Sequence, residues 1–146
     1  MLRCTQQTWC YPPTNKGSSP NTNRLAIDLF NLTTLDGARV LYLDRVEAQW
    51  PLRLTLDVGS HVPLHCTASG KLFLAQMPKK ARDAMIDGLP LPRMTASTLP
   101  DPAALRAECD AIAQDGFSRD REEFMAGLVA VAVPVRDAAG EVRAAL

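Results

Sequence analysis

The order of two hydrophobic periodicities constrains the fold of this chain more than any single motif does. Strand-like segments follow one another within 29–59, helical segments separated by a proline-rich loop at 89–100 lie within 67–116, and apolar residues alternate with polar or small ones again within 127–146. A period of two is typical of a half-buried strand, and a period of about 3.6 is typical of a helix. Strands at both ends with helices between them predict an α+β fold, in which an antiparallel sheet carries helices packed on it.

The first strands are expected to form a hairpin. LFNLTTL at 29–35 and ARVLYLDRVE at 38–47 are rich in residues that favour strands. Asp36 and Gly37 between them are a strong two-residue turn signal. LRLTLDVG at 52–59 is predicted to form a third short strand. Together these stretches predict the first part of the sheet.

Three helices are predicted in the central block, each bounded by recognisable end signals. Pro78 ends the first helix, because proline cannot continue a helical hydrogen-bond ladder. Gly88 is placed just beyond the end of the second, at the C′ position. Asp101 caps the third, Pro102 occupies its first turn, and Gly116 ends it. The helices are predicted within the stretches 67–77, 79–89 and 101–116.

The last part of the chain returns to strand-like alternation. Residues 117–125 are charged and suit an edge strand or a loop, and 142–146 begin a final strand. GLVAVAVPVRD at 127–137 is predicted to be one strand, with Pro134 at an edge or near its end because proline has no N–H to donate. One face of this strand carries Val129, Val131, Val133 and Val135, and the other carries Leu128, Ala130 and Ala132.

Composition limits the partners of the chain. Residues 1–24 are polar and rich in turn residues, which predicts an irregular or disordered arm. Lys and Arg together number 16, as do Asp and Glu, so the formal net charge is zero. A nucleic-acid-binding domain usually carries a basic excess, so charge gives no argument that this chain binds DNA.

The cysteines do not form a metal-binding or disulfide pattern. Cys66 and Cys109 fall in helical contexts and are expected to be free thiols, whereas Cys4 and Cys10 are compatible with either state. The spacing of Cys and His does not suit zinc, and no metal or cofactor is predicted. Because the sequence has no membrane-length apolar run and no signal-peptide core, we expect a cytoplasmic protein without membrane contact.

The junction VPLHCTASGKLFLAQM at 62–77 has small residues where a helix begins. Ala68, Ser69 and Gly70 leave the backbone there accessible. Such a stretch suits close packing of the helix on a sheet. It equally suits an anion held by the unpaired N–H groups and the dipole of a helix N-terminus. The residues alone leave both interpretations open.

Three segments together resemble the effector-binding domain of the IclR family of bacterial transcriptional regulators. They are LTTLDGARVLYLDRVE, VGSHVPLHCTASGKLFLAQMP and TLPDPAALRAECDAIAQDGFSRDREEFMAGLVAVAVPVRDAAGEV, within residues 29–146. The resemblance implies a GAF-like domain that binds a small organic acid, has no enzymatic activity, and works in a dimer or tetramer. It also implies DNA binding through a winged helix-turn-helix domain. The resemblance is specific because two blocks occur in the same sequence, namely VGSxxPLHxTASGK and DREEFxxGLxAVAVPVRDxxGEV.

Both ends depart from the family pattern. Residues 1–24 are too few for a winged helix-turn-helix, and one interpretation is that they are not family sequence. In the family, the last strand continues beyond the position of Leu146 with small hydroxyl or glycine residues, and a helix follows. We therefore expect residues 25–146 to be an effector domain that lacks the end of that strand and the C-terminal helix. DNA contact would come only through an absent N-terminal domain.

The resemblance also places an effector site on this sequence. Ala68 and Ser69 occupy effector-contacting positions, which favours the ligand interpretation of the small residues. Asp120 matches an acidic contact that would otherwise be taken for one more solvated charge. Leu128 and Ala130 would share a pocket wall, although each alone is commonly a core residue. The expected effector-binding residues are Leu54, Val62, Ala68, Ser69, Gly70, Asp120, Leu128 and Ala130.

Two other functions stay open at this stage. The chain is alternatively an oligomerisation or structural module without a ligand, whose valine strand lies near an interface. A small enzyme using Cys66 with His61 or His65, or using Asp120 and Glu123, is a weaker alternative. Thiolate or acid–base catalysis needs converging, oriented groups, and the sequence shows no such set.

Overall fold

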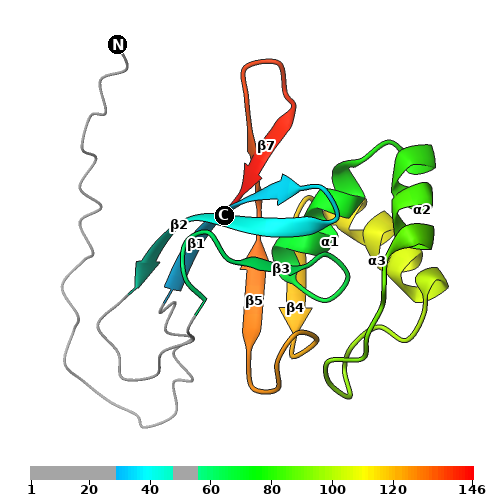
Figure 1. Cartoon of the computed structure of the whole chain (residues 1–146). Coiled ribbons are helices and arrows are strands. Elements are labelled where there is room, and N and C mark those ends of the chain that lie inside the picture. Colours follow the sequence, from blue (N-terminus) through cyan, green and yellow to red (C-terminus); the bar gives the residue numbers. More distant parts are fainter. Residues whose placement is uncertain (1–28, 48–55) are drawn as a thin grey trace, which may run out of the picture.

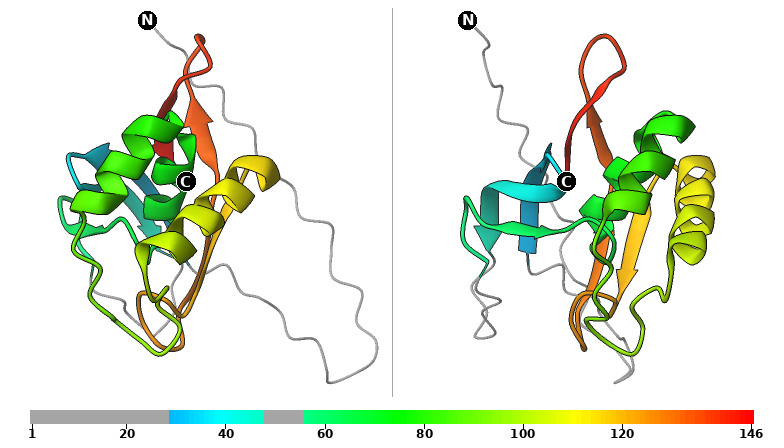
Figure 2. Two further views of the ribbon diagram at one scale, coloured as in Figure 1. Left: turned by 90° about the vertical axis from the view of Figure 1, so that its right-hand side faces the viewer. Right: turned by 45° about the vertical axis from the view of Figure 1, so that its right-hand side comes forward.

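The computed structural model describes residues 29–47 and 56–146. A five-stranded antiparallel sheet has the strand order β3-β2-β1-β7-β6, and a second sheet pairs β4 with β5 (Figure 1). The helices gather on one side of the larger sheet (Figure 2). This arrangement confirms the predicted α+β class. The strands are β1 Leu29–Asp36, β2 Arg39–Glu47, β3 His61–Pro63, β4 Ser118–Arg121, β5 Val129–Ala132, β6 Pro134–Arg136 and β7 Val142–Ala145, and the helices are α1 Ala68–Gln76, α2 Lys79–Gly88 and α3 Pro102–Asp115.

The predicted β1–β2 hairpin is confirmed, with its turn one residue later than expected. Asp36 ends β1 and pairs with Arg39, so Gly37 and Ala38 form the turn. Gly37 has a φ of 57°, a conformation that glycine adopts without steric cost. The hairpin fixes which face of β2 is turned inward, and Val40 on that face is fully buried.

The third strand differs from its prediction over 52–59. Residues 52–55 lie outside the described ranges, and 56–59 form a loop and a turn rather than a strand. Ser60 O accepts from the N–H of Tyr42 at 3.1 Å, and the N–H of Gly59 donates to Tyr42 O at 2.8 Å. These bonds align the chain with β2, so the strand begins only after the turn, at His61.

The single strand predicted over 127–137 is divided into β5 and β6. β5 pairs with β4, whereas β6 pairs with β7. Between them Val133 exchanges two backbone hydrogen bonds with Leu146, at 2.9 and 3.0 Å. This segment therefore connects the two sheets. Pro134 begins the edge strand β6, as its missing N–H predicts.

The helix ends follow the sequence signals with one exception. The side chain of Asp101 caps α3 by accepting from the N–H of Ala104 at 2.8 Å, and Gly116 ends this helix with a φ of 79°. Gly88 was predicted to lie beyond α2 but is its last helical residue. Leu89 leaves the helix in an extended conformation instead, because a residue before proline disfavours the helical region.

Helix α1 is the centre of the packing. It contacts α3 and strands of both sheets, and most of its side chains are buried. At Gly70 the helix meets the backbone of Leu64 so closely that an added Cβ would lie 2.3 Å from the Leu64 carbonyl oxygen. A side chain of any size is therefore excluded at this position.

Gly70→Ala is expected to destabilise the fold by about 3 kcal/mol, the upper part of the range for overpacked cores, because the obstacle is backbone. Gly88→Ala is the matched control, since a Cβ at Gly88 meets nothing within 4 Å. It should stabilise the chain by about 0.5–1 kcal/mol, as helical Gly→Ala changes do. Urea unfolding of both variants tests this, and equal stability of the two would contradict the packing argument.

Candidate functional site

The N-terminus of α1 leaves two backbone donors available. The side chain of Thr67 caps the helix by accepting from the N–H of Gly70 at 3.2 Å, and its hydroxyl donates to Pro63 O at 2.7 Å. Within the described ranges, no group accepts a hydrogen bond from the N–H of Ala68 or of Ser69. Ala68 is buried and Ser69 is half-buried. These N–H groups lie where the helix dipole favours an anion.

Gly70 plays a different part from its two neighbours. Its N–H is taken by Thr67, and its missing side chain makes room for the Leu64 backbone. The close-packing interpretation of the small residues therefore holds at Gly70. The anion interpretation depends on Ala68 and Ser69.

Asp120 is a buried carboxylate on β4, with a side chain only 1% exposed. Its Oδ1 accepts from the N–H of Glu123 at 2.8 Å and, more weakly, from that of Phe124 at 3.4 Å. Burial raises the pKa of Asp120, and the charge of Glu123 adds to this rise, while the two hydrogen bonds and Lys71 oppose it. Asp120 is thus not a solvated strand residue.

A buried ion cluster lies next to Asp120. The side chain of Lys71 on α1 is fully buried, and its Nζ lies 2.5 Å from Glu123 Oε1 and 3.2 Å from Glu108 Oε1 on α3. The second carboxylate oxygen of Glu123 and the hydroxyl of Ser118 are buried, and neither has a partner among the described residues. Lys71 therefore joins α1 to α3 and to the loop after β4.

The structure places several of the expected site residues in or beside the hydrophobic core. Asp120 pairs directly with Ala130 across the β4–β5 sheet. Val62 and Ala68 belong to the core cluster against which Ala130 packs. Leu128, half-buried just before β5, lies outside this cluster. Leu54 is not among the described residues.

Tyr42 was missed by the sequence reasoning. It shares the inner face of β2 with Val40 and packs against the core. Burial raises the pKa of the Tyr42 phenol, and the nearby charge of Asp120 contributes to the rise against an opposing effect of Arg45. Its alternation with Val40 was the available signal, but only the assembled sheets place Tyr42 near Asp120.

The structure does not assemble the cysteine-based catalytic site. Burial, followed by the charges of Asp120 and Glu123, raises the pKa of the Cys66 thiol to about 12, so it stays protonated at neutral pH. His65 Nε2 lies 3.0 Å from Pro92 O, and His61 Nε2 lies 2.7 Å from a carboxylate oxygen of Asp36. Both imidazoles are therefore engaged elsewhere.

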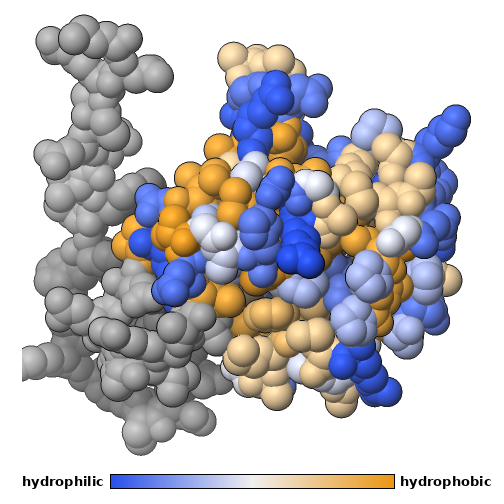
Figure 3. Space-filling view, in the orientation of Figure 1, coloured by the Kyte–Doolittle hydropathy of each residue, from blue (hydrophilic) through white to orange (hydrophobic). Residues whose placement is uncertain are grey.

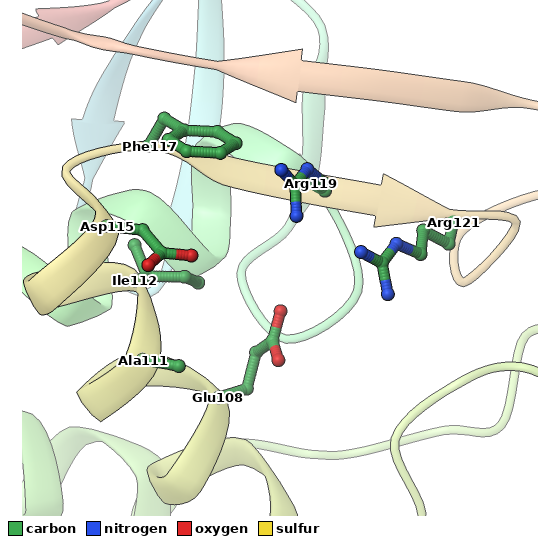
Figure 4. A pocket seen from close by; sticks show the side chains of 7 residues that line it. All are labelled: Glu108, Ala111, Ile112, Asp115, Phe117, Arg119 and Arg121. Carbon is green, nitrogen blue, oxygen red and sulfur yellow. The ribbon is translucent and has the colours of Figure 1, made fainter.

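Two cavities among the described residues have a different lining from the expected site. The smaller, about 180 Å³, lies between α3 and β4 (Figure 4). Arg119 and Arg121 enter it from β4, opposite Glu108 and Asp115 from α3. The larger, about 440 Å³, lies beside β3. Of the expected site residues, Val62 alone lines one of these cavities, the larger.

Within the described ranges, no group of three or more His, Cys, Asp or Glu side chains could hold a metal ion. None of the helices in the same ranges is long and apolar enough to cross a membrane.

Comparisons with known proteins agree on one family. The family described as "Bacterial transcriptional regulator IclR C-terminal" matches residues 19–146. "Probable transcriptional regulator SauR" of Cupriavidus necator is 50% identical over 105 residues, which cover 72% of this chain. The solved IclR of Thermotoga maritima has a TM-score of 0.76 and 31% identity, and covers 81% of the chain.

A solved IclR homolog from Microbacterium hydrocarbonoxydans, complexed with 4-hydroxybenzoate, has a TM-score of 0.74 and 29% identity over 81% of this chain. The chain spans 42% of the length of SauR and 48% of each of these two solved chains. The similarity therefore concerns less than half of each relative.

The buried Asp120 carboxyl predicts a pH-dependent stability. Because its pKa is raised above 3.8, the folded chain binds this proton more tightly than the unfolded chain does. Its stabilising contribution is therefore present below about pH 4 and is lost as pH rises through the raised pKa. Asp120→Asn, whose amide oxygen still accepts from Glu123, should gain stability relative to the unmodified chain as pH rises.

Asp137→Asn is a control for which we expect the opposite pH dependence of the stability change. A hydrogen bond from Arg143 lowers the pKa of Asp137, so that carboxylate stabilises the fold above about pH 4 and the contribution is lost on acidification. Urea unfolding of both variants between about pH 2 and pH 7 measures the two trends, because the Asp137 contribution is lost below about pH 4. For each variant, the difference in unfolding free energy from the unmodified chain is followed against pH. If the two differences change in the same direction as pH rises, burial does not control the pKa of Asp120.

Proposed function

This chain belongs to the IclR family of bacterial transcriptional regulators, and we propose that it is the part of such a regulator that senses a small organic acid. The observation that carries the proposal is the pair of unbonded N–H groups of Ala68 and Ser69 at the start of α1. In a complete regulator, the effector would alter DNA binding by a winged helix-turn-helix domain. That such a domain is joined to this one is part of the proposal.

The carboxylate of the effector would bind at the helix N-terminus. Two N–H groups and the Ser69 hydroxyl offer three donors there. A helix N-terminus also carries the equivalent of about half a positive charge, which favours an anion. Ala68, in the first turn of α1, is buried in the hydrophobic core. A small acid bound there would therefore contact apolar surface.

Asp120 would receive the other end of the effector. Helix α1 packs directly against β4 and β5, so the start of α1 and Asp120 belong to neighbouring elements. A carboxylate accepts hydrogen bonds, so a hydroxyl or hydrate on the effector would suit it. Ala130 opposite Asp120 is small, and Leu128 adds apolar surface. An organic acid with a second, hydrogen-bond-donating group is therefore the favoured class.

Sensing is favoured over catalysis by the state of the reactive groups. The family consists of transcriptional regulators. In this chain, the Cys66 thiol has a raised pKa and both histidines are bound to other partners. We therefore expect saturable binding without turnover.

Thermal unfolding against a panel of small carboxylates, from glyoxylate and pyruvate to hydroxybenzoates, tests the proposal. An effector at about a hundredfold excess over its Kd should add about 2.7 kcal/mol, which raises Tm by several degrees in a domain of this size. Ser69→Trp should abolish the shift by filling the site. Ser97→Trp, on an exposed loop, is the matched control and should keep it.

A shift that survives Ser69→Trp would place the effector elsewhere in the chain. A cooperative melt that no acid displaces would count against sensing and favour the structural alternative.

Association between copies is a second function favoured by a specific observation. The valines of β5, β6 and their junction form an exposed apolar row, comprising Val129, Val131, Val133 and Val135. On the face shown in Figure 3, further hydrophobic surface gathers over the β1–β2 hairpin. Extended apolar surface of this kind commonly marks a contact between chains. We propose that the valine row forms part of an interface between copies of this chain in a homo-oligomer.

Val131→Lys should weaken this association, because it places a charge in the apolar row. Val58→Lys is the matched control, since Val58 is equally exposed, at 58%, but lies in the turn before β3. Sedimentation velocity over a range of protein concentrations should show more monomer for Val131→Lys alone. An unchanged distribution in both variants would exclude the valine row as the interface.

A further inference from the structure

The larger cavity has the features of a separate binding site. It lies between the β1–β2 turn and β3 on one side and the segment after α2 on the other. Its volume of about 440 Å³ falls within the range that small-molecule sites occupy. Val62 is the one expected effector-binding residue that lines it, whereas Ser69, Asp120 and Ala130 do not. The cavity is therefore separate from the helix N-terminus and the carboxyl group on which the effector site proposed above depends.

The walls are apolar and conformationally restricted. Val62 and Leu89 contribute hydrophobic side chains, while Pro63, Pro90 and Pro92 contribute rings that fix the backbone. The ring nitrogen of the buried His65 donates to Pro92 O at 3.0 Å and holds the loop against β3. A preformed wall of this kind loses little conformational entropy when a ligand binds.

One cationic group at the cavity has no partner. Arg39 lines it, and within the described ranges its side chain forms neither an ion pair nor a hydrogen bond. Asp36 pairs with Arg39 across the hairpin end, but its carboxylate is bonded to His61 at 2.7 Å. The donors of the Arg39 guanidinium are therefore available to an incoming anion, and guanidinium matches carboxylate geometry.

We propose that this cavity is a second ligand site, which takes a small apolar monocarboxylate. The carboxylate pairs with Arg39, and the hydrocarbon part packs on Val62, Leu89 and the prolines. An apolar cavity with one unpaired cation fits such a molecule better than it fits a neutral or polyanionic one.

Backbone amide NMR of the ¹⁵N-labelled chain, titrated with hexanoate, tests the proposal. Signals of Ala38, Arg39, His61 and Leu89 should shift together and saturate. Arg39→Gln should weaken hexanoate binding about tenfold, the effect expected for one charge-assisted hydrogen bond. Arg39→Lys should retain most of the affinity because it retains the charge.

Two controls isolate the role of the charge. Arg121→Gln removes an exposed arginine at the smaller cavity and should leave hexanoate binding unchanged. 1-Hexanol has the same chain length without the carboxylate. It should bind more weakly, and Arg39→Gln should not affect its binding.

Other outcomes would overturn the proposal without affecting the function proposed above. Shifts confined to Ala68, Ser69 and Asp120 would mean that hexanoate uses the effector site. Equal losses in Arg39→Gln and Arg121→Gln would indicate non-specific charge. Signals around Ala38 and Leu89 that change with protein concentration before any ligand is added would identify a second copy of the chain as the occupant.

Discussion

The contact between the Leu64 backbone and Gly70 determines how the rest of this domain is assembled. It sets α1 directly on the segment leaving β3, at a separation that no other residue type permits. Because α1 is buried against both sheets and α3, its position also fixes theirs. The first turn of α1, where Ala68 and Ser69 offer their N–H groups, is thereby held against the core.

The candidate site concentrates polar groups that a stability-optimised core would avoid. Asp120 is a buried carboxyl group, and Ser118 and one oxygen of Glu123 are buried without partners among the described residues. Each such group costs free energy relative to an apolar replacement. Local conflicts of this kind are expected where function, rather than stability, has determined the residue. These residues lie on β4 or in the loop after it, and β4 packs against α1.

Much of the fold was predictable because its signals are local. The turn glycine, the helix cap at Asp101 and the position of Pro134 depend on a few adjacent residues. The errors arose where distant segments decide the structure. β3 begins at His61 because Tyr42 aligns the preceding turn, and 127–137 divides because two different strands pair with its halves. For the site, the sequence alone could not show that Asp120 is buried or that Tyr42 approaches it.

Lys71 lies on α1, and its buried ammonium contacts the carboxylates of both Glu108 and Glu123. The charge of Lys71 on α1 is thus neutralised by carboxylates from two distant segments, α3 and the loop after β4. Losing one partner of a buried ion pair commonly costs several kcal/mol, whereas joint replacement by well-packed apolar groups is often neutral. Evolutionary routes between charged and apolar versions of this cluster therefore cross a barrier at each single step. Positions 71 and 123 should change as a correlated pair, and designed libraries that vary them one at a time would miss the viable combinations.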